Sequence, residues 1–291
     1  MIDINELTPV EEHNGILYKR DDLFLPFGEY GTSGGKVRQA LSLIDETLDN
    51  IKENYNSAVI THTQVSSTTG TIFARVCKHY GIKCIICVGG TTPNSIKKHH
   101  MMALAKLWGA EIRNVCGHGM HAPVMSRLHE IVEREKVFNV VFSDNVDLYP
   151  ESVLDTTADQ VKNIPDELDN LIISVGSGIQ MAGILRGVLK YKKNIKNIYG
   201  VCIGPERRKK INSYINPLEY YPLPKYEMVV LDTHYAKGET DFFENNQLDE
   251  LYEAKAHKWM HSNIDSRENT LFWVVGRRLT IQEVKENYNC I

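Results

Sequence analysis

The chain has 291 residues, of which 42% are hydrophobic and 24% charged, values typical of a globular protein large enough for two lobes. Its net charge of −4 provides no broad basic surface for nucleic acid or membrane. No hydrophobic run approaches the ~20 residues that span a bilayer, and the N-terminus lacks the pattern of a signal peptide. Three of the cysteines lie in or beside hydrophobic stretches, as free buried cysteines do, so we expect a reducing, cytoplasmic compartment.

Short hydrophobic runs alternate with helical patterns along the chain. The predicted order is an extended segment at 17–20, a helix after residue 36, a strand at 58–60, a helix at 70–80, a strand at 83–88, a helix at 95–108, a strand at 111–115, a helix at 125–135 and a strand at 138–142. There follow a helix at 155–162, a strand at 171–175, a helix at 179–190, strands at 197–203 and 228–231, a helix at 248–260 and a strand at 271–275. Strands that are hydrophobic on both faces predict an α/β protein of two domains, with parallel sheets covered by helices on both faces.

Lys36 follows a glycine pair and opens a predicted helix. The hydrophobic stripe that defines this helix comprises Val37, Ala40, Leu41, Ile44, Leu48 and Ile51. The partial positive charge of a helix N-terminus disfavours a second cation and favours the neutral amine of lysine. A neutral amine forms a Schiff base with an aldehyde cofactor such as pyridoxal phosphate. An ordinary surface lysine in a turn is the alternative, because short motifs recur by chance.

Two loops between a strand and a helix are candidate anion sites. The hydroxyl loop (residues 66–70) is predicted to offer hydroxyls and backbone N–H groups to a carboxylate, or to serve only as a helix cap. The glycine loop (residues 176–180) is suited to a phosphate, or forms a plain tight turn. It is neither a dinucleotide fingerprint nor a Walker loop, because glycine is missing at position 181 and no Gly-Lys-Ser/Thr follows.

Other segments favour structural roles. Cys116, His118 and His121 lie close enough in sequence to hold a metal, but two intervening glycines leave them poorly organised and we expect a polar loop with no metal. Cys84 and Cys87 fall within one strand, where they point to opposite faces and belong to the core. His62 either lines a cleft or is a hydrogen-bonded structural residue. The basic cluster at 207–210 is expected to form a solvated loop or the start of a helix.

In order and spacing, these segments resemble the pyridoxal-phosphate enzymes of fold type II, the tryptophan-synthase β-like family. The segments 18–23, 34–38 and 248–256 are similar to the aminocyclopropane-carboxylate deaminase and D-cysteine desulfhydrase branch. The hydroxyl loop resembles the substrate-carboxylate loop of cysteine synthases, and residues 107–111 match another segment common in that group. The resemblance covers nearly the whole chain.

The resemblance implies a large cofactor domain of residues 1–40 and 151–291 and a small substrate domain of residues 41–150, with the cofactor between the lobes and a homodimer as the assembly. Lys36 would carry the cofactor and act as the base at the substrate Cα, with Ser67 as a second catalytic residue. The phosphate would be held by Gly176, Ser177, Gly178, Ile179 and Gln180. A small amino-acid substrate would place its carboxylate on Ser66, Ser67, Thr68, Thr69 and Gly70. The expected reaction is elimination, β-replacement or deamination.

The chain departs from the family pattern at several positions. Gly35 replaces an asparagine, and Thr68 stands where an asparagine contacts the ring hydroxyl of the cofactor. Val275 stands where serine or threonine meets the pyridine nitrogen, and valine cannot hydrogen-bond that atom. These departures leave open two alternatives: a descendant without cofactor that binds a phosphorylated or nucleotide-like ligand, or a structural subunit.

Overall fold

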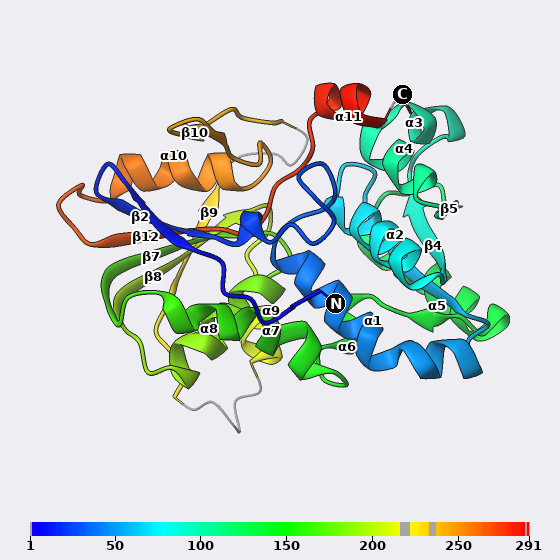
Figure 1. Cartoon of the computed structure of the whole chain (residues 1–291), viewed down its shortest axis with the longest axis horizontal. Helices are drawn as coiled ribbons and strands as arrows, with labels where there is room; N and C mark the ends of the chain where they lie inside the picture. The colour runs from blue at the N-terminus through cyan, green and yellow to red at the C-terminus, as the bar shows by residue number, and fades with distance from the viewer. Residues whose placement is uncertain (1, 216–221, 233–236, 289, 291) are drawn as a thin grey trace. The chain divides into compact units, whose positions relative to one another are not determined.

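The computed structural model describes residues 2–215, 222–232, 237–288 and 290. Contacts divide the chain into two compact units (Figure 1). The first unit comprises Met1–Leu25, Ser33–Gln39 and Pro150–Arg277. The second unit comprises Pro26–Thr32, Ala40–Tyr149 and Arg278–Ile291. Helix α1 (Gly35–Asn54) begins in the first unit and continues into the second.

The first unit is built on a six-stranded sheet in the order β1-β2-β12-β7-β8-β9. Only the β1–β2 pair is antiparallel; the other neighbours are parallel. The strands are β1 (Val10–His13), β2 (Ile16–Arg20), β7 (Glu167–Val175), β8 (Asn194–Ile203), β9 (Glu227–Leu231) and β12 (Thr270–Val274). The predicted strands of this half are therefore present, and β1 is an addition that the sequence analysis did not predict.

Helices cover both faces of this sheet (Figure 1). On one face, α10 (Glu253–Asn263) and the small hairpin β10 (Phe242–Phe243) and β11 (Asn246–Gln247) pack on side chains such as Tyr18, Ile172 and Phe272. On the other face lie α7 (Thr156–Ala158), α8 (Ile179–Lys190) and α9 (Arg208–Tyr214). Alternate residues of each strand thus enter opposite cores, which explains the continuous hydrophobic runs.

The second unit contains a four-stranded parallel sheet in the order β5-β4-β3-β6. Its strands are β3 (Ala58–His62), β4 (Lys83–Gly89), β5 (Glu111–Cys116) and β6 (Phe138–Asn139). Its further helices are α2 (Thr68–Tyr80), α3 (Pro93–Lys98), α4 (His100–Leu107), α5 (His121–Glu135), α6 (Phe142–Asn145) and α11 (Ile281–Tyr288). Helix α5 packs on a core that includes Ile60, Ile85 and Cys87, and Cys84 and Cys87 are both buried as expected. The α/β class with covered parallel sheets is confirmed.

Four predicted elements differ most from the structure; smaller shifts include the helix expected at 125–135, which begins at His121, and the strand expected at 171–175, which begins at Glu167. The helix expected at 95–108 is interrupted at His99, whose extended backbone separates α3 from α4. The strand expected at 138–142 ends at Asn139, and α6 begins at Phe142. The helix expected at 155–162 is a run of π, α and 3₁₀ turns, Glu151–Asp155, Thr156–Ala158 and Asp159–Asn163.

The fourth difference is the helix expected at 248–260, which begins only at Glu253. The Asp249 carboxylate accepts the backbone N–H groups of Leu251 (2.9 Å) and Tyr252 (3.1 Å). This local turn competes with helix formation, as aspartate side chains commonly do.

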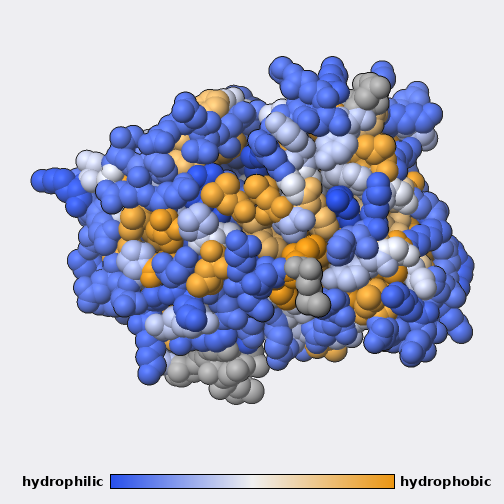
Figure 2. Space-filling view, in the orientation of Figure 1, coloured by the Kyte–Doolittle hydropathy of each residue, from blue (hydrophilic) through white to orange (hydrophobic). Residues whose placement is uncertain are grey.

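Hydrophilic residues dominate the face shown in Figure 2, and hydrophobic residues there form separate patches. Within the described ranges, no helix combines the length and hydrophobicity needed to cross a bilayer.

A buried ion pair fixes the first turn of α1. Arg38 and Asp21 are both 0% exposed, and Arg38 Nη1 donates to Asp21 Oδ1 at 2.8 Å. Trp273 Nε1, from β12, donates to Asp21 Oδ2 at 3.4 Å, and the guanidinium of Arg38 lies over the ring of Phe24 at 4.3 Å. The pair therefore ties together the 3₁₀ turn after β2 (Asp21–Leu23), the start of α1 and the end of the sheet.

We expect Arg38→Met to lower the free energy of unfolding by about 3–5 kcal/mol, because it leaves the Asp21 charge buried without its partner. Urea denaturation followed by circular dichroism measures this change. Arg267→Met is the matched control, because Arg267 and its partner Asp265 are both exposed and the variant should unfold like the wild type. Equal stability of the two variants would contradict the role given to the buried pair.

The buried amine of Lys19 should make the free energy of unfolding depend on pH. Burial lowers the pKa of Lys19 from 10.5 to about 8. The Asp21 charge opposes this lowering, and the Arg38 charge adds to it. The unfolded chain therefore binds more protons than the folded chain between these values, so stability rises with pH there by up to about 1.4 kcal/mol per pH unit. Lys19→Met should lack this rise when urea midpoints are compared from pH 7 to pH 10. Parallel curves for the two proteins would show that the Lys19 pKa is not lowered.

Candidate active site

Lys36 is the second residue of α1 and is partly exposed. The glycine pair before it packs directly against the backbone that follows β12. The Gly35 N–H donates to the Val275 carbonyl at 3.0 Å. Gly34 has φ 92°, and a Cβ there would lie only 2.3 Å from the Val275 oxygen. The start of the lysine helix is therefore held by a close approach that only glycine permits.

Gly35 also faces the helix that follows the glycine loop. A Cβ at this position would lie 2.7 Å from Gln180 Oε1 and 2.9 Å from Asp21 Oδ2. The Gln180 side chain is held by Gln39, to which its Nε2 donates at 2.7 Å, and by the Thr157 hydroxyl, which donates to Oε1 at 3.2 Å. Any side chain at position 35 would displace this network, which explains glycine where the family pattern has asparagine.

The glycine loop joins β7 to α8 and leaves the helix N-terminus uncapped by any side chain. Gly178 is the N-cap with φ 96°, and a Cβ there would lie 2.8 Å from Ile211 Cγ1. Ser177 is exposed, and the side chain of Arg207 donates from Nε to the Gly176 carbonyl at 3.1 Å. Backbone N–H groups at the start of a helix, with a guanidinium nearby, form a suitable site for a phosphate.

Tyr252 connects the lysine to the glycine loop, and the sequence analysis did not single it out. The Lys36 Nζ lies 5.9 Å from the centroid of its ring. A Cβ on Gly176 would lie 2.8 Å from Tyr252 Cε1, so the ring rests on the loop backbone. The next residue, Glu253, begins α10 and is only 4% exposed. The segment 248–256 contributed to the family resemblance, and this signal could have identified both residues.

The hydroxyl loop belongs to the second unit and continues into α2, which begins at Thr68. Ser67 is the N-cap, and its Oγ accepts the Thr69 N–H at 3.3 Å. Ser66, Thr68 and Thr69 are partly exposed, and Gly70 is buried against Thr63. The Ser67 hydroxyl thus performs the capping role given as the alternative, while the other hydroxyls remain accessible to a carboxylate.

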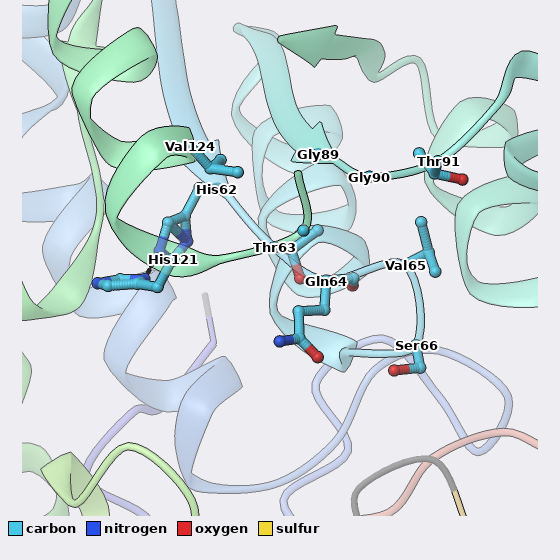
Figure 3. Close-up of a pocket in the computed structure, with 11 residues that line it drawn as sticks. His62, Thr63, Gln64, Val65, Ser66, Gly89, Gly90, Thr91, His121 and Val124 are labelled. Atoms are coloured by element: carbon cyan, nitrogen blue, oxygen red, sulfur yellow. Dashed lines mark hydrogen bonds between the residues drawn. The ribbon is translucent and has the colours of Figure 1, made fainter. Parts of the chain in front are cut away.

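A pocket of about 360 Å³ lies beside this loop, at the carboxyl ends of β3 and β4 (Figure 3). His62 and His121 line it and are hydrogen-bonded, with 2.7 Å between His62 Nε2 and His121 Nδ1. His62 therefore lines a cleft and is hydrogen-bonded at the same time. Cys116 Sγ donates to the His118 carbonyl at 3.0 Å, and the part of the chain that the structure describes has no group of three or more His, Cys, Asp or Glu side chains placed to hold a metal.

Comparisons with known proteins identify the family and the fold. Residues 1–226 match the family described as pyridoxal-phosphate dependent enzyme, and the chain belongs to that family. The O-seryl-dTMP PLP-dependent decarboxylase of Salmonella phage ViI is 26% identical in an alignment of 347 residues that covers 94% of this chain and 81% of the relative.

Solved structures share the fold. An ACC deaminase homologue has a TM-score of 0.72 at 19% identity, covering 94% of this chain and 91% of that one. An O-acetylserine dependent cystathionine beta-synthase from Helicobacter pylori has a TM-score of 0.65 at 16% identity, covering 94% of each chain. The predicted resemblance and cofactor, pyridoxal phosphate, are confirmed.

The residues of the first unit fit this cofactor. The uncapped start of α8 provides backbone N–H donors for its phosphate, and the Lys36 side chain in the same unit is partly exposed. Bound pyridoxal phosphate draws electrons from the Cα of an amino acid, and this is the chemistry that the protein itself lacks.

Gly178→Ala should weaken binding of pyridoxal phosphate by about tenfold or more, because the new methyl group collides with Ile211 and shifts the loop. The positive φ alone costs about 1–2 kcal/mol of stability. Gly109→Ala is the matched control, since Gly109 has φ 92° and no other group lies within 4 Å of the place that its Cβ would take. Spectrophotometric titration with the cofactor should separate the two variants, and equal affinities would exclude the loop as the phosphate site.

Proposed function

We propose that this pyridoxal-phosphate dependent enzyme is a lyase that decarboxylates an O-substituted serine, whose side-chain oxygen carries a nucleotide. The grouping of Lys36, Tyr252 and the glycine loop in one unit supports catalysis at an amino-acid Cα. The substrate class is supported by the phage relative, which aligns over 94% of this chain and whose name specifies O-seryl-dTMP.

Each residue has a defined task in this proposal. Lys36 carries the cofactor and then moves a proton at Cα. Residues 176–180 hold the phosphate through backbone N–H groups, and the hydroxyl loop orients the amino acid through its carboxylate, with Thr68 toward the ring hydroxyl. Breaking the Cα–carboxylate bond releases CO₂, and a proton taken up at Cα balances the reaction. Tyr252, whose ring centroid lies 5.9 Å from Lys36 Nζ, flanks the amine and limits where it can move.

The ring nitrogen requires a separate assignment. The Val275 backbone is anchored by Gly35, and its side chain offers no hydrogen bond. We propose that Val275 packs against the ring and leaves the nitrogen without a hydrogen bond from this strand.

Elimination, β-replacement or deamination, the reactions expected from the family resemblance, form the second candidate. The hydroxyl loop favours it, because donors that hold the substrate carboxylate firmly direct reaction toward the Cα proton. Incubation with serine joined through its side-chain oxygen to thymidine monophosphate distinguishes the two. Decarboxylation yields CO₂ and the corresponding amine, whereas elimination yields pyruvate and ammonia, and mass spectrometry of the nucleotide product identifies which bond has broken.

Lys36→Ala should fold but form no covalent link to the cofactor and lose activity by several orders of magnitude. The wild-type protein should absorb in the visible, and borohydride should abolish this band and attach the cofactor to the peptide containing Lys36. Lys52→Ala is the matched control, because Lys52 is an exposed lysine on the same helix. Recovery of the modified peptide at Lys19 or another lysine would overturn the assignment.

A further inference from the structure

The pocket at the ends of β3 and β4 is lined by none of the residues proposed to hold the cofactor. Its lining includes Ser66, the first residue of the hydroxyl loop, so it begins where the amino-acid part of the substrate is proposed to bind. A volume of about 360 Å³ is at the small end of the range for ligand pockets and suits a single ring with its substituents.

One wall of this pocket is rigid because two backbone segments touch there. A Cβ on Gly89 would lie 2.2 Å from the His118 carbonyl oxygen, and a Cβ on Gly90 would lie 2.4 Å from the Gly119 nitrogen. The Gly90 N–H also donates to the Cys116 carbonyl at 3.1 Å. The shape of this wall is therefore set by the backbone and does not depend on adaptable side chains.

An adjoining wall carries the histidine pair. The rings of His62 and His121 meet edge to face with centroids 4.5 Å apart, and Figure 3 shows them across the pocket from Ser66 and Thr91. Burial, followed by the nearby His121, lowers the pKa of His62 to about 4, so His62 is uncharged at neutral pH. Its Nδ1 is buried and lacks a hydrogen-bond partner among the described residues.

The described lining contains no lysine, arginine, aspartate or glutamate. Val65 and Val124 contribute hydrophobic surface, and Thr91 contributes a hydroxyl on the rim. A phosphate would find no positive charge to match it there, whereas an uncharged planar ring with polar edges would satisfy both kinds of surface. The buried His62 Nδ1 without a partner favours a ligand that offers a hydrogen-bonding group.

We infer that this pocket binds the pyrimidine base carried by the substrate, with His62 Nδ1 hydrogen-bonding an edge of the ring and Val124 packing beside it. The inference rests on the proposed function, because it assumes that the serine oxygen bears a nucleotide. On this inference, uncharged side chains of the second unit recognise the base and so select the substrate.

Calorimetry of the holoenzyme with thymidine, an uncharged probe, tests the inference. Wild-type protein should bind thymidine, and inorganic phosphate should not displace it. His62→Leu should raise Kd about tenfold through loss of the hydrogen bond, and Thr91→Phe, which fills the pocket from its rim, should abolish binding. His129→Leu is the control, because His129 bonds Asp144 at 2.9 Å and does not line the pocket.

Thymidine binding that survives both pocket variants, or that phosphate displaces, would overturn the inference. The cofactor spectrum separates this result from failure of the proposed function. A protein that binds thymidine through His62 but never takes up pyridoxal phosphate would retain the pocket and refute the enzyme. A protein that carries the cofactor on Lys36 but does not bind thymidine would refute only the inference that the pocket binds the base.

Discussion

The ion pair between Asp21 and Arg38 is the constraint on which the geometry of the first unit depends. Both groups are fully buried, so the cost of removing them from water is offset only if their positions are held accurately. Trp273 donates to the same carboxylate, which brings the central strand β12 into this arrangement. Lys36 lies two residues before Arg38, so fixing the arginine fixes where the lysine side chain leaves the backbone.

Close backbone packing extends this constraint to the glycine loop. Gly34, Gly35, Gly176 and Gly178 each face a neighbouring group that a Cβ would strike, and these neighbours include the Val275 carbonyl and the Tyr252 ring. Gln180 completes the connection, because its side chain lies against Gly35 while its backbone belongs to the loop. Lys36 and the glycine loop, the proposed cofactor contacts, are therefore positioned by shared contacts that leave no room for an asparagine side chain at position 35.

The sequence predicted those features that depend on local periodicity. The alternation of strands and helices, the helix opened by Lys36 and the turn at Gly178 all follow from residue spacing and glycine placement. Features that depend on distant contacts were missed. Tyr252 lies beside Lys36 although more than two hundred residues separate them in sequence. No sequence pattern predicts the hydrogen bond between His62 and His121. The break at His99 was also missed, because the hydrophobic pattern continues through it.

The candidate sites of the two units differ in electrostatic character. In the first unit, an uncapped helix start and Arg207 favour an anion. In the second unit, the pocket presents uncharged imidazole, hydroxyl and hydrophobic groups. Close backbone contacts at Gly89 and Gly90 fix one wall of this pocket, so in the proposed base site the side chains of His62 and Thr91 would select the ring. On that proposal, substitution at His62 or Thr91 should change which substituent is accepted and leave Lys36 and the glycines beside it intact, because these lie in the first unit.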